Sequence, residues 1–177
     1  SRLIRDLGSH VLSGRFTINW FKSDLFLESN RNNTTLISLT NEAIEDKTTQ
    51  PKLVLTHLYM PHAPFYYDRH GNLRDKDQVF SETEKSPFPY QPYLDYVFYT
   101  NSVLISMIED IFLKSVRKPI IILLSDHGFR SLPEETSKSY YFKNYAAVYL
   151  PDKDYSKFYP NVSNVNIFPL VLNSHFN

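Results

Sequence analysis

The chain contains no cysteine in its 177 residues. Disulfide bonds, thiolate metal sites and cysteine nucleophiles are therefore excluded. The chain also carries no net charge, because lysine plus arginine and aspartate plus glutamate each number 19. A neutral chain gives no reason to expect a nucleic acid or an anionic membrane surface as partner. Long apolar runs are missing too, so we expect no segment of this chain to span a bilayer.

Aromatic residues, by contrast, are abundant, with 13 tyrosines, 13 phenylalanines and one tryptophan. Such a composition is typical of grooves that face carbohydrate or lipid, and equally of a core that favours aromatic packing. The length is sufficient for one domain with a substantial core. The sequence begins at Ser1 without a methionine or a signal peptide, and we expect it to be cut from a longer protein.

Residues 119–128, which read Pro-Ile-Ile-Ile-Leu-Leu-Ser-Asp-His-Gly, hold the strongest functional pattern in the chain. Their five consecutive apolar residues are too few for a helix and predict a strand buried on both faces. The strand delivers Asp126 and His127 to its carboxyl end, where ligands bind in open α/β sheets. A carboxylate beside an imidazole suits Zn²⁺ or Mn²⁺. Gly128 permits a sharp turn, and an ordinary turn is the competing interpretation of this pattern.

A second apolar run, at residues 52–59, predicts another strand. It leads into Met60–Phe65, in which His62 is flanked by two prolines that exclude regular structure. We expect these prolines to hold His62 on a stiff, extended segment. Residues 60–91 then form one long connection rich in proline and aromatic residues, and connections of this kind are usually lids or binding loops.

The clearest helix is predicted for residues 92–116, whose apolar residues form a continuous stripe. A second helix is predicted for residues 34–46, after a polar loop at 24–33. The face that this helix buries is expected to consist of Leu36, Leu39, Ala43 and Ile44. The other expected elements are a broken amphipathic helix at 1–22, an irregular segment at 129–143, a strand at 145–150 and a helix at 165–176, in which Pro169 is tolerable only in the first turn.

Strand 52–59, helix 92–116 and strand 119–125 form a β-α-β unit in this scheme. Such units join parallel strands by a right-handed crossover, so both strands end at the same edge of the sheet. Neighbouring strands lie about 4.8 Å apart. The sequence therefore predicts the α/β fold class, with a mostly parallel sheet.

The same topology gathers four side chains at one sheet edge, because His57 and His62 emerge there beside Asp126 and His127. A chance gathering of several metal-competent or acid-base side chains is much rarer than any one of them. A histidine inside a strand is more often a core residue than a ligand, so this alternative stays open for His57. The other histidines, interpreted as surface or packing residues, are His10, His70 and His175.

Two of these motifs together resemble a known family. Ile122–Gly128 resembles the metal-binding strand end of the alkaline phosphatase superfamily, and its sulfatase-like branch most of all. That branch includes sulfatases and the membrane-anchored phosphoethanolamine and phosphoglycerol transferases. Tyr59–Phe65 is similar to the segment of those transferases that carries a substrate-contacting histidine. The resemblance extends over residues 50–177, since 144–151 and 165–173 are similar to the closing part of bacterial sulfatase-like domains.

The resemblance implies a three-layer α/β/α domain with a mostly parallel sheet. In this family the nucleophile and the first acidic metal ligand precede the region that the chain covers, and nothing before Lys52 resembles their strand. We therefore expect residues 1–177 to form one partial domain, the carboxyl-terminal half of a catalytic domain. Residues 1–50 would be a helical lead-in, and residues 51–177 would form the β-α-β core.

The resemblance also implies roles for individual residues. Asp126 and His127 would bind a divalent metal, which is Zn²⁺, Mn²⁺ or Ca²⁺ in the complete domain. His62 would contact the transferred group or stabilise its leaving oxygen. The nearest hydroxyls, Ser125 and Ser131, do not resemble an activated nucleophile, so we assign none within this chain. The further candidates for contact with the substrate are His57, Arg130 and Tyr66.

The implied function is part of a metal-dependent sulfatase-like hydrolase, or of a transferase of phosphoryl or head groups, that acts on phosphate or sulfate esters. Family members commonly have an acidic residue where this chain has Phe129-Arg130. A non-catalytic module that binds glycan or lipid head groups through its aromatic loop is therefore the alternative.

The expected partners are the missing amino-terminal part of the same domain and, because a half-sheet exposes a strand edge, a second copy of the chain. The expected location is the extracytoplasmic face of a bacterial cytoplasmic membrane, reached only through upstream membrane segments.

Overall fold

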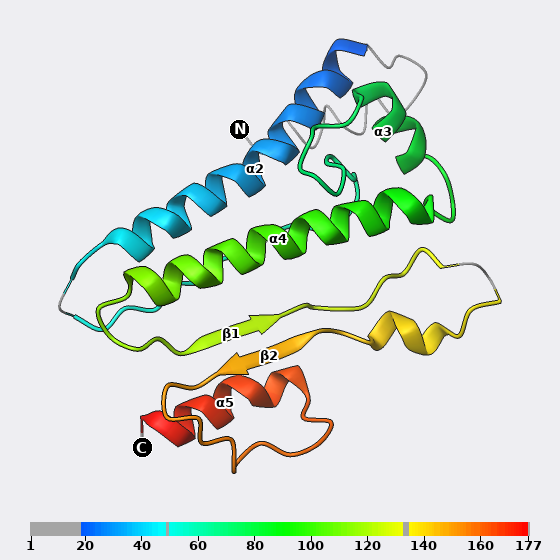
Figure 1. The fold of residues 1–177 in the computed structure, drawn as a ribbon. Helices are drawn as coiled ribbons and strands as arrows, with labels where there is room; N and C mark the ends of the chain where they lie inside the picture. The colour runs from blue at the N-terminus through cyan, green and yellow to red at the C-terminus, as the bar shows by residue number, and fades with distance from the viewer. Residues whose placement is uncertain (1–18, 49, 133–134, 177) are drawn as a thin grey trace, which may run out of the picture. The chain divides into compact units, whose positions relative to one another are not determined.

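The computed structural model describes residues 19–48, 50–132 and 135–176 (Figure 1). Within these residues helices predominate, and strands are short and few. The elements in chain order are α2 (Asn19–Glu45), α3 (Lys76–Thr83), α4 (Tyr90–Lys114), β1 (Ile121–Leu124), the 3₁₀ helix η1 (Lys138–Phe142), β2 (Ala146–Tyr149) and α5 (Asn164–His175).

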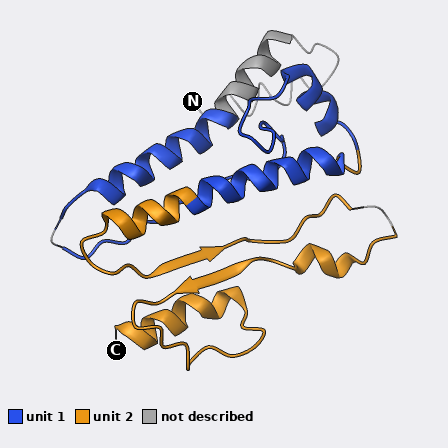
Figure 2. Ribbon diagram, viewed as in Figure 1, with its two compact units in different colours: residues 1–85, 89–105 blue, residues 86–88, 106–177 orange. Residues whose placement is uncertain are grey.

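The chain divides into two compact units, which Figure 2 shows in different colours. Unit 1 consists of the described residues up to Lys85 together with Pro89–Ile105. Unit 2 consists of Ser86–Phe88 and of the described residues from Ser106 onward. Helix α4 contributes its first part to unit 1 and its last part to unit 2.

Helix α2 runs without a break through residues 24–33, where the sequence predicted a loop. In the part of that stretch whose side chains the structure describes, Arg31 and Asn32 are exposed, as polar side chains on the outer face of an amphipathic helix are. The buried face also differs from the predicted one, since Leu39 is 53% exposed whereas Asn33 and Thr40 are buried. Of the four predicted face residues, Ile44 is buried. The helix therefore turns two polar side chains inward, and these need partners.

Residues 51–59 do not form the predicted strand. The sheet that the described residues form has two strands, β1 and β2, which pair antiparallel with Ile121 opposite Tyr149. The predicted parallel pairing of 52–59 with 119–125 is therefore wrong for this structure, and the three-layer parallel arrangement is not confirmed. An apolar run predicts strand conformation, but a strand also needs a neighbour that completes its hydrogen bonds.

The segment 51–59 instead lies along α2 in an extended conformation. Asn33 Oδ1 accepts a hydrogen bond from the Tyr59 N–H at 2.8 Å, and the hydroxyls of Thr40 and Thr56 lie 2.7 Å apart. The two anchors on α2, Asn33 and Thr40, are seven positions apart, which corresponds to a rise of about 10.5 Å along the helix. Their partners in the segment, Thr56 and Tyr59, are three positions apart, which corresponds to about 10 Å in an extended chain. At the far end, the ammonium group of Lys52 donates to carbonyl oxygens at the carboxyl end of α2.

Unit 1 has an aromatic core in which Phe65 and Tyr66 pack against Tyr96 of α4. All three side chains are buried, and the ring centroids of each pair lie 6.2 and 6.5 Å apart. Edge-to-face pairs of this kind each contribute about 0.5–1.5 kcal/mol beyond the area that they bury. Helix α3 lies inside the predicted connection 60–91 and adds Val79 to this core.

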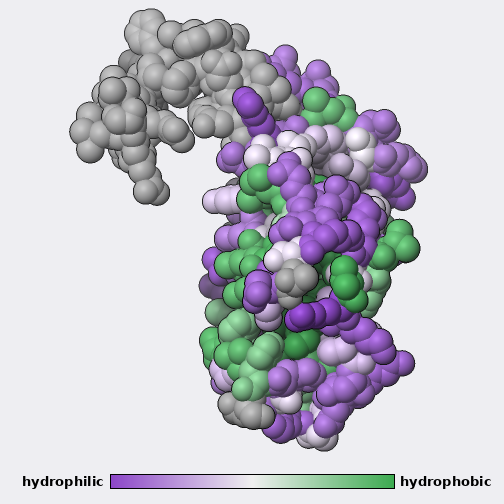
Figure 3. All heavy atoms as spheres, turned by 90° about the vertical axis from the view of Figure 1, so that its left-hand side faces the viewer, coloured by the Kyte–Doolittle hydropathy of each residue, from purple (hydrophilic) through white to green (hydrophobic). Residues whose placement is uncertain are grey.

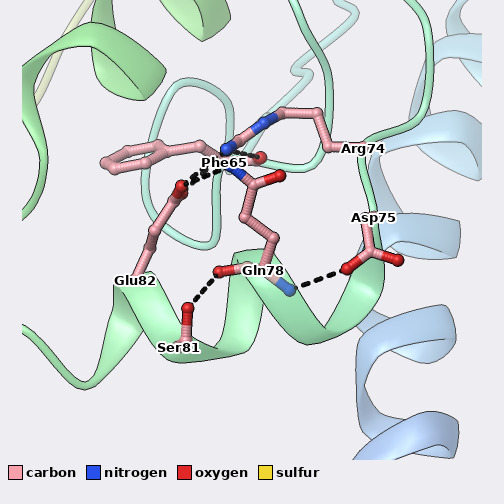
Figure 4. Close-up of polar contacts among 6 residues, drawn as sticks. All are labelled: Phe65, Arg74, Asp75, Gln78, Ser81 and Glu82. Atoms are coloured by element: carbon pink, nitrogen blue, oxygen red, sulfur yellow. Dashed lines mark hydrogen bonds and ion pairs between the residues drawn. The ribbon is translucent and has the colours of Figure 1, made fainter.

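A buried ion pair joins Arg74, which follows the loop, to Glu82 of α3 (Figure 4). The guanidinium donates two hydrogen bonds to the carboxylate, at 2.7 and 2.9 Å, and a third to the Phe65 carbonyl oxygen at 3.0 Å. The side chains of the pair are only 12% and 7% exposed. Asp75 caps α3 by accepting a hydrogen bond from the Gln78 N–H. These contacts hold the loop before α3 to the helix.

Unit 2 is a two-stranded sheet packed against α5. Its buried core consists of Leu150, Ile167 and Val171, and partly buried residues of both strands pack around it. Strand β1 is half-buried, with Leu124 42% exposed, whereas the sequence predicted burial on both faces. Pro169 lies in the second turn of α5, beyond the predicted first turn. It is tolerated on an exposed face, where water can bind the carbonyl oxygen that proline leaves free.

Large hydrophobic side chains are also exposed in both units. Leu53 and Leu55 of unit 1 are 81% and 90% exposed, and Leu113 and Val116 of unit 2 are 82% and 81% exposed. Figure 3 shows hydrophobic residues at the surface of one face of the molecule.

By length and composition, α4 is the one helix in the described part of the chain that could cross a membrane. Core helices of globular domains meet the same criterion. In unit 1 this helix buries Tyr96 and Thr100.

The burial of the Arg74–Glu82 pair predicts a large effect of removing one partner. Glu82→Gln leaves the guanidinium charge buried and unpaired, so we expect the free energy of unfolding to fall by about 3–5 kcal/mol. The matched control is Asp95→Asn, which breaks the more exposed Arg69–Asp95 pair and should cost about 1 kcal/mol or less. Urea unfolding followed by circular dichroism measures both. Equal small losses for the two variants would contradict the structural importance of the buried pair.

Candidate functional site

Asp126 and His127 follow the carboxyl end of β1 after one residue, Ser125, close to where the sequence predicted them. Strand pairing continues one residue beyond β1, because the Ser125 N–H donates to the Tyr145 carbonyl oxygen at 2.9 Å. Asp126 Oδ2 and His127 Nε2 then lie 3.5 Å apart. The Asp126 side chain is 81% exposed and the His127 side chain 29% exposed. A carboxylate and an imidazole nitrogen therefore meet at an accessible position at the end of the strand.

The orientation of the His127 ring is set by the main chain. Its Nδ1 lies 2.7 Å from the Gly128 carbonyl oxygen. Because a carbonyl oxygen can only accept, Nδ1 must carry the proton of the neutral ring. The lone pair is then on Nε2, the nitrogen beside Asp126, which is the arrangement that metal-binding histidines commonly have.

Gly128 is required by a close approach of the backbone. A Cβ at this position would lie 2.1 Å from the Tyr140 carbonyl oxygen and 2.7 Å from that of Lys143. The Gly128 N–H also donates to the Tyr141 carbonyl oxygen at 2.9 Å. The glycine that the sequence assigned to a sharp turn therefore makes room for η1, which packs behind the Asp-His pair.

His62 lies in a turn, where the sequence predicted an extended segment. Its N–H donates to the Tyr59 carbonyl oxygen at 2.8 Å, and the peptide bonds preceding Pro61 and Pro64 are both cis. The Nδ1 atom of the ring lies 2.6 Å from the Ala63 carbonyl oxygen. The same argument as for His127 places the proton on Nδ1 and leaves the Nε2 lone pair free.

His57, Tyr59 and His62 form a row of neighbouring rings in unit 1. The rings of His57 and Tyr59 are stacked at a centroid distance of 6.2 Å, and the ring of His62 meets Tyr59 edge-on at 6.0 Å. Tyr59 is 66% exposed, and both histidines are exposed as well. His57 is therefore a surface residue in this structure, and the alternative of a core histidine is wrong.

The other predicted residues lie in different surroundings. Arg130 is exposed in unit 2, whereas Tyr66 is buried against Tyr96 in unit 1, so the described contacts of Tyr66 are packing contacts. Contact of either residue with a substrate stays a prediction. Of the histidines assigned to the surface or to packing, His70 is exposed, His175 is largely buried beside Asp152, and His10 lies outside the described residues.

The hydroxyls nearest to the Asp-His pair are both engaged with the main chain. Ser125 Oγ accepts from the Tyr145 N–H at 2.6 Å, and Ser131 Oγ accepts from the Phe88 N–H at 2.5 Å. A hydroxyl nucleophile needs an adjacent base to take its proton, and among the described residues neither serine contacts a carboxylate or an imidazole. The absence of a nucleophile among these serines stays a prediction.

The structure brings the predicted residues together in two groups. Asp126 and His127 meet in unit 2, and His57 and His62 lie near each other in unit 1. The meeting of the two groups stays a prediction. Among the described residues, no group of three or more side chains has the composition and spacing to hold a metal ion. The Asp-His pair alone would supply two ligands.

Sequence reasoning missed the residues that position the His57 and His62 segment. These residues lie on α2: Asn33 binds the backbone N–H of Tyr59, and Thr40 binds the hydroxyl of Thr56. Asn33 belongs to a run of polar residues and Thr40 follows Leu39, and propensity alone assigns such polar residues to loop or helix surface. The available signal was their spacing, because residues seven positions apart lie on the same face of a helix.

The turn that follows His62 is fixed by Asp68. Its carboxylate accepts hydrogen bonds from the backbone N–H groups of His70 and Asn72 and from the Asn72 side chain, at 2.8–2.9 Å. The bonds from Asn72 lower the pKa of Asp68. Because the pKa is lowered in the folded state, this contribution to stability is present above the usual value of 3.8 and is lost as the pH falls below it. The turn is therefore held at neutral pH.

A comparison with known protein families identifies one match. The family model described as Sulfatase matches residues 10–168, which is most of the chain. No curated protein and no solved structure matches the chain significantly. The match includes both the His62 segment and the Asp-His pair.

We expect the neutral rings of His62 and His127 to carry their proton on Nδ1, because each Nδ1 faces a carbonyl oxygen. Nitrogen chemical shifts of the ¹⁵N-labelled chain at alkaline pH distinguish the two tautomers. His70 serves as the control, since its exposed ring has no carbonyl partner among the described residues and should show a mixture. A signal from Nε2–H in His127 would contradict a lone pair directed toward Asp126.

Proposed function

Because the chain belongs to the sulfatase family of the alkaline phosphatase superfamily, we propose that it is part of a metal-dependent enzyme acting on phosphate or sulfate esters. The enzyme would be a hydrolase or a transferase of phosphoryl or head groups. The observation that carries the proposal is the pairing of Asp126 with a His127 ring whose lone pair faces the carboxylate. Members of the family generally use a divalent metal ion.

The Asp-His pair fits two positions of a divalent metal site. Two ligands at about 2.1 Å from a tetrahedral ion lie about 3.4 Å from each other. The separation of Asp126 Oδ2 and His127 Nε2 is 3.5 Å. An imidazole ligand favours Zn²⁺ or Mn²⁺ over Ca²⁺, which prefers oxygen ligands. When bound, the ion supplies Lewis-acid polarisation of the ester and activation of a hydroxyl nucleophile.

His62 is proposed to contact the transferred group or its leaving oxygen. Its Nδ1 is held by the Ala63 carbonyl oxygen, so Nε2 is the atom available to the substrate. The neutral ring can accept a proton there, and the protonated ring can donate one to a leaving oxygen. The bond to Ala63 keeps this direction in both states, because Nδ1 carries a proton in each.

Cationic and aromatic side chains complete the proposed substrate site. The guanidinium of Arg130 is exposed and suits bidentate hydrogen bonding to the oxygens of a phosphate or sulfate ester. His57 would contact the substrate beside His62.

A non-catalytic function is favoured by one observation, the exposed ring of Tyr59 stacked on His57. Such a surface can hold the apolar face of a sugar or a lipid head group without any chemistry. Binding of this kind would not depend on Asp126, His127 or a metal, which separates it from the enzymatic function.

We expect Zn²⁺ or Mn²⁺ to bind this chain weakly, because two ligands leave at least two positions of a tetrahedral site to other groups. Calorimetric titration measures the affinity. Asp126→Ala and His127→Ala should each reduce it by about tenfold or more, and the control His70→Ala should leave it unchanged. Tight binding that survives both substitutions would mean that the metal ligands lie elsewhere.

We also expect the 177-residue chain to show only background turnover of p-nitrophenyl phosphate, of a phosphodiester and of a sulfate ester. Neither nearby serine is activated, and catalysis needs a nucleophile within about 3–3.5 Å of the reacting atom. Release of p-nitrophenol in Zn²⁺ and in Mn²⁺ is the measurement. Turnover that His127→Ala abolishes would show that the chain holds a complete site.

A further inference from the structure

The segment 51–59 presents one uncovered row of large side chains. Leu53, Leu55 and Tyr59 are 81%, 90% and 66% exposed, whereas Val54 between the leucines is 44% exposed. The alternation has the period of two that a strand shows when one face packs and the other does not. Helix α2 covers the packed face, and the row on the other face consists of apolar and aromatic side chains at every second position.

The main chain of this segment is also open. From Lys52 to Leu58, no backbone N–H or carbonyl oxygen has a hydrogen-bonding partner among the described residues. The first anchored backbone group is the N–H of Tyr59, which donates to Asn33. Seven extended residues with free donors and acceptors are a template for pairing with another strand.

We propose that this open edge pairs with the same segment of a second copy of the chain, antiparallel and about a two-fold axis at Leu55. Leu55 is the central residue of the open stretch. Antiparallel pairing about it places Leu53 opposite the partner's His57 and Val54 opposite the partner's Thr56. The proposal goes beyond the proposed enzymatic function and does not depend on it.

Three properties make a second copy the fitting occupant. A two-fold interface uses the same surface on both partners, and the chain itself supplies an open edge of the required length. No like charges oppose each other, because Lys52 is the single charged residue of the stretch and its ammonium is bound to carbonyl oxygens of α2. The chain has no net charge that would keep copies apart.

Pairing in this way joins the exposed rows of two copies into one apolar surface, and the two α2 helices lie on the opposite face. A strand has two edges, and the dimer would use one of them.

Single-cysteine variants test the proposal directly, because the chain has no cysteine of its own. In the proposed pairing the two copies of residue 55 face each other with Cα atoms about 4.5–5.5 Å apart, within reach of a disulfide. The two copies of residue 53 are offset by four residues, or about 14 Å, which is too far. We therefore expect Leu55→Cys to form an intermolecular disulfide under mild oxidation and Leu53→Cys to remain reduced.

Leu53 and Leu55 are almost equally exposed, so the two variants differ in register and hardly in accessibility. Non-reducing gel electrophoresis measures the cross-link, and light scattering of the unmodified chain should show twice its mass of 20.8 kDa. Leu55→Lys should return the chain to a monomer, because it sets two ammonium groups opposite each other. A monomer at all concentrations, or cross-linking of Leu53→Cys equal to or greater than that of Leu55→Cys, would overturn the proposal.

Discussion

The buried ion pair between Arg74 and Glu82 is the interaction on which the order of unit 1 depends most. Backbone pairing in the loop that follows His62 is limited to the antiparallel bridge between Tyr67 and Leu73 and its neighbouring hydrogen bonds, so side chains supply further order. The guanidinium binds the carboxylate of α3 and the Phe65 carbonyl oxygen at the same time. Phe65 in turn packs on Tyr96. Because the pair is removed from water, both charges are costly to leave alone, and loop and helix are therefore held together.

The two histidines of the proposed site are oriented by a shared device. His62 and His127 each place Nδ1 on the carbonyl oxygen of the following residue, Ala63 and Gly128 respectively. This contact is local, so it does not depend on how distant parts of the chain are arranged. It leaves Nε2 of both rings available, for a substrate in one case and for a metal in the other. Two turns far apart in sequence thus present equivalent chemistry.

The sulfatase family places the chain in the α/β class, yet the described sheet is small. The segment 51–59 has the exposure pattern of a strand, and α2 covers one of its faces. What it lacks is a strand beside it. The ligand set beside Asp126 is likewise small, because no group of three or more potential metal ligands occurs among the described residues.

The sequence alone determined the parts that local chemistry controls. The apolar run before Ser125 formed β1, the long amphipathic stripe formed α4, and Asp126 and His127 came together because they are neighbours. These features depend on periodicity and adjacency, which a sequence displays directly.

Only the tertiary structure decided which face each element buries and which strands pair. Helix α2 turned Asn33 and Thr40 inward because the segment 51–59 supplied them with hydrogen-bonding partners. β1 paired antiparallel with β2 instead of parallel with 51–59, and Gly128 proved to accommodate the backbone of η1. Each outcome depends on a partner far away in sequence. Propensity describes what conformation a segment favours, whereas the free energy of packing and hydrogen bonding determines which neighbour it takes.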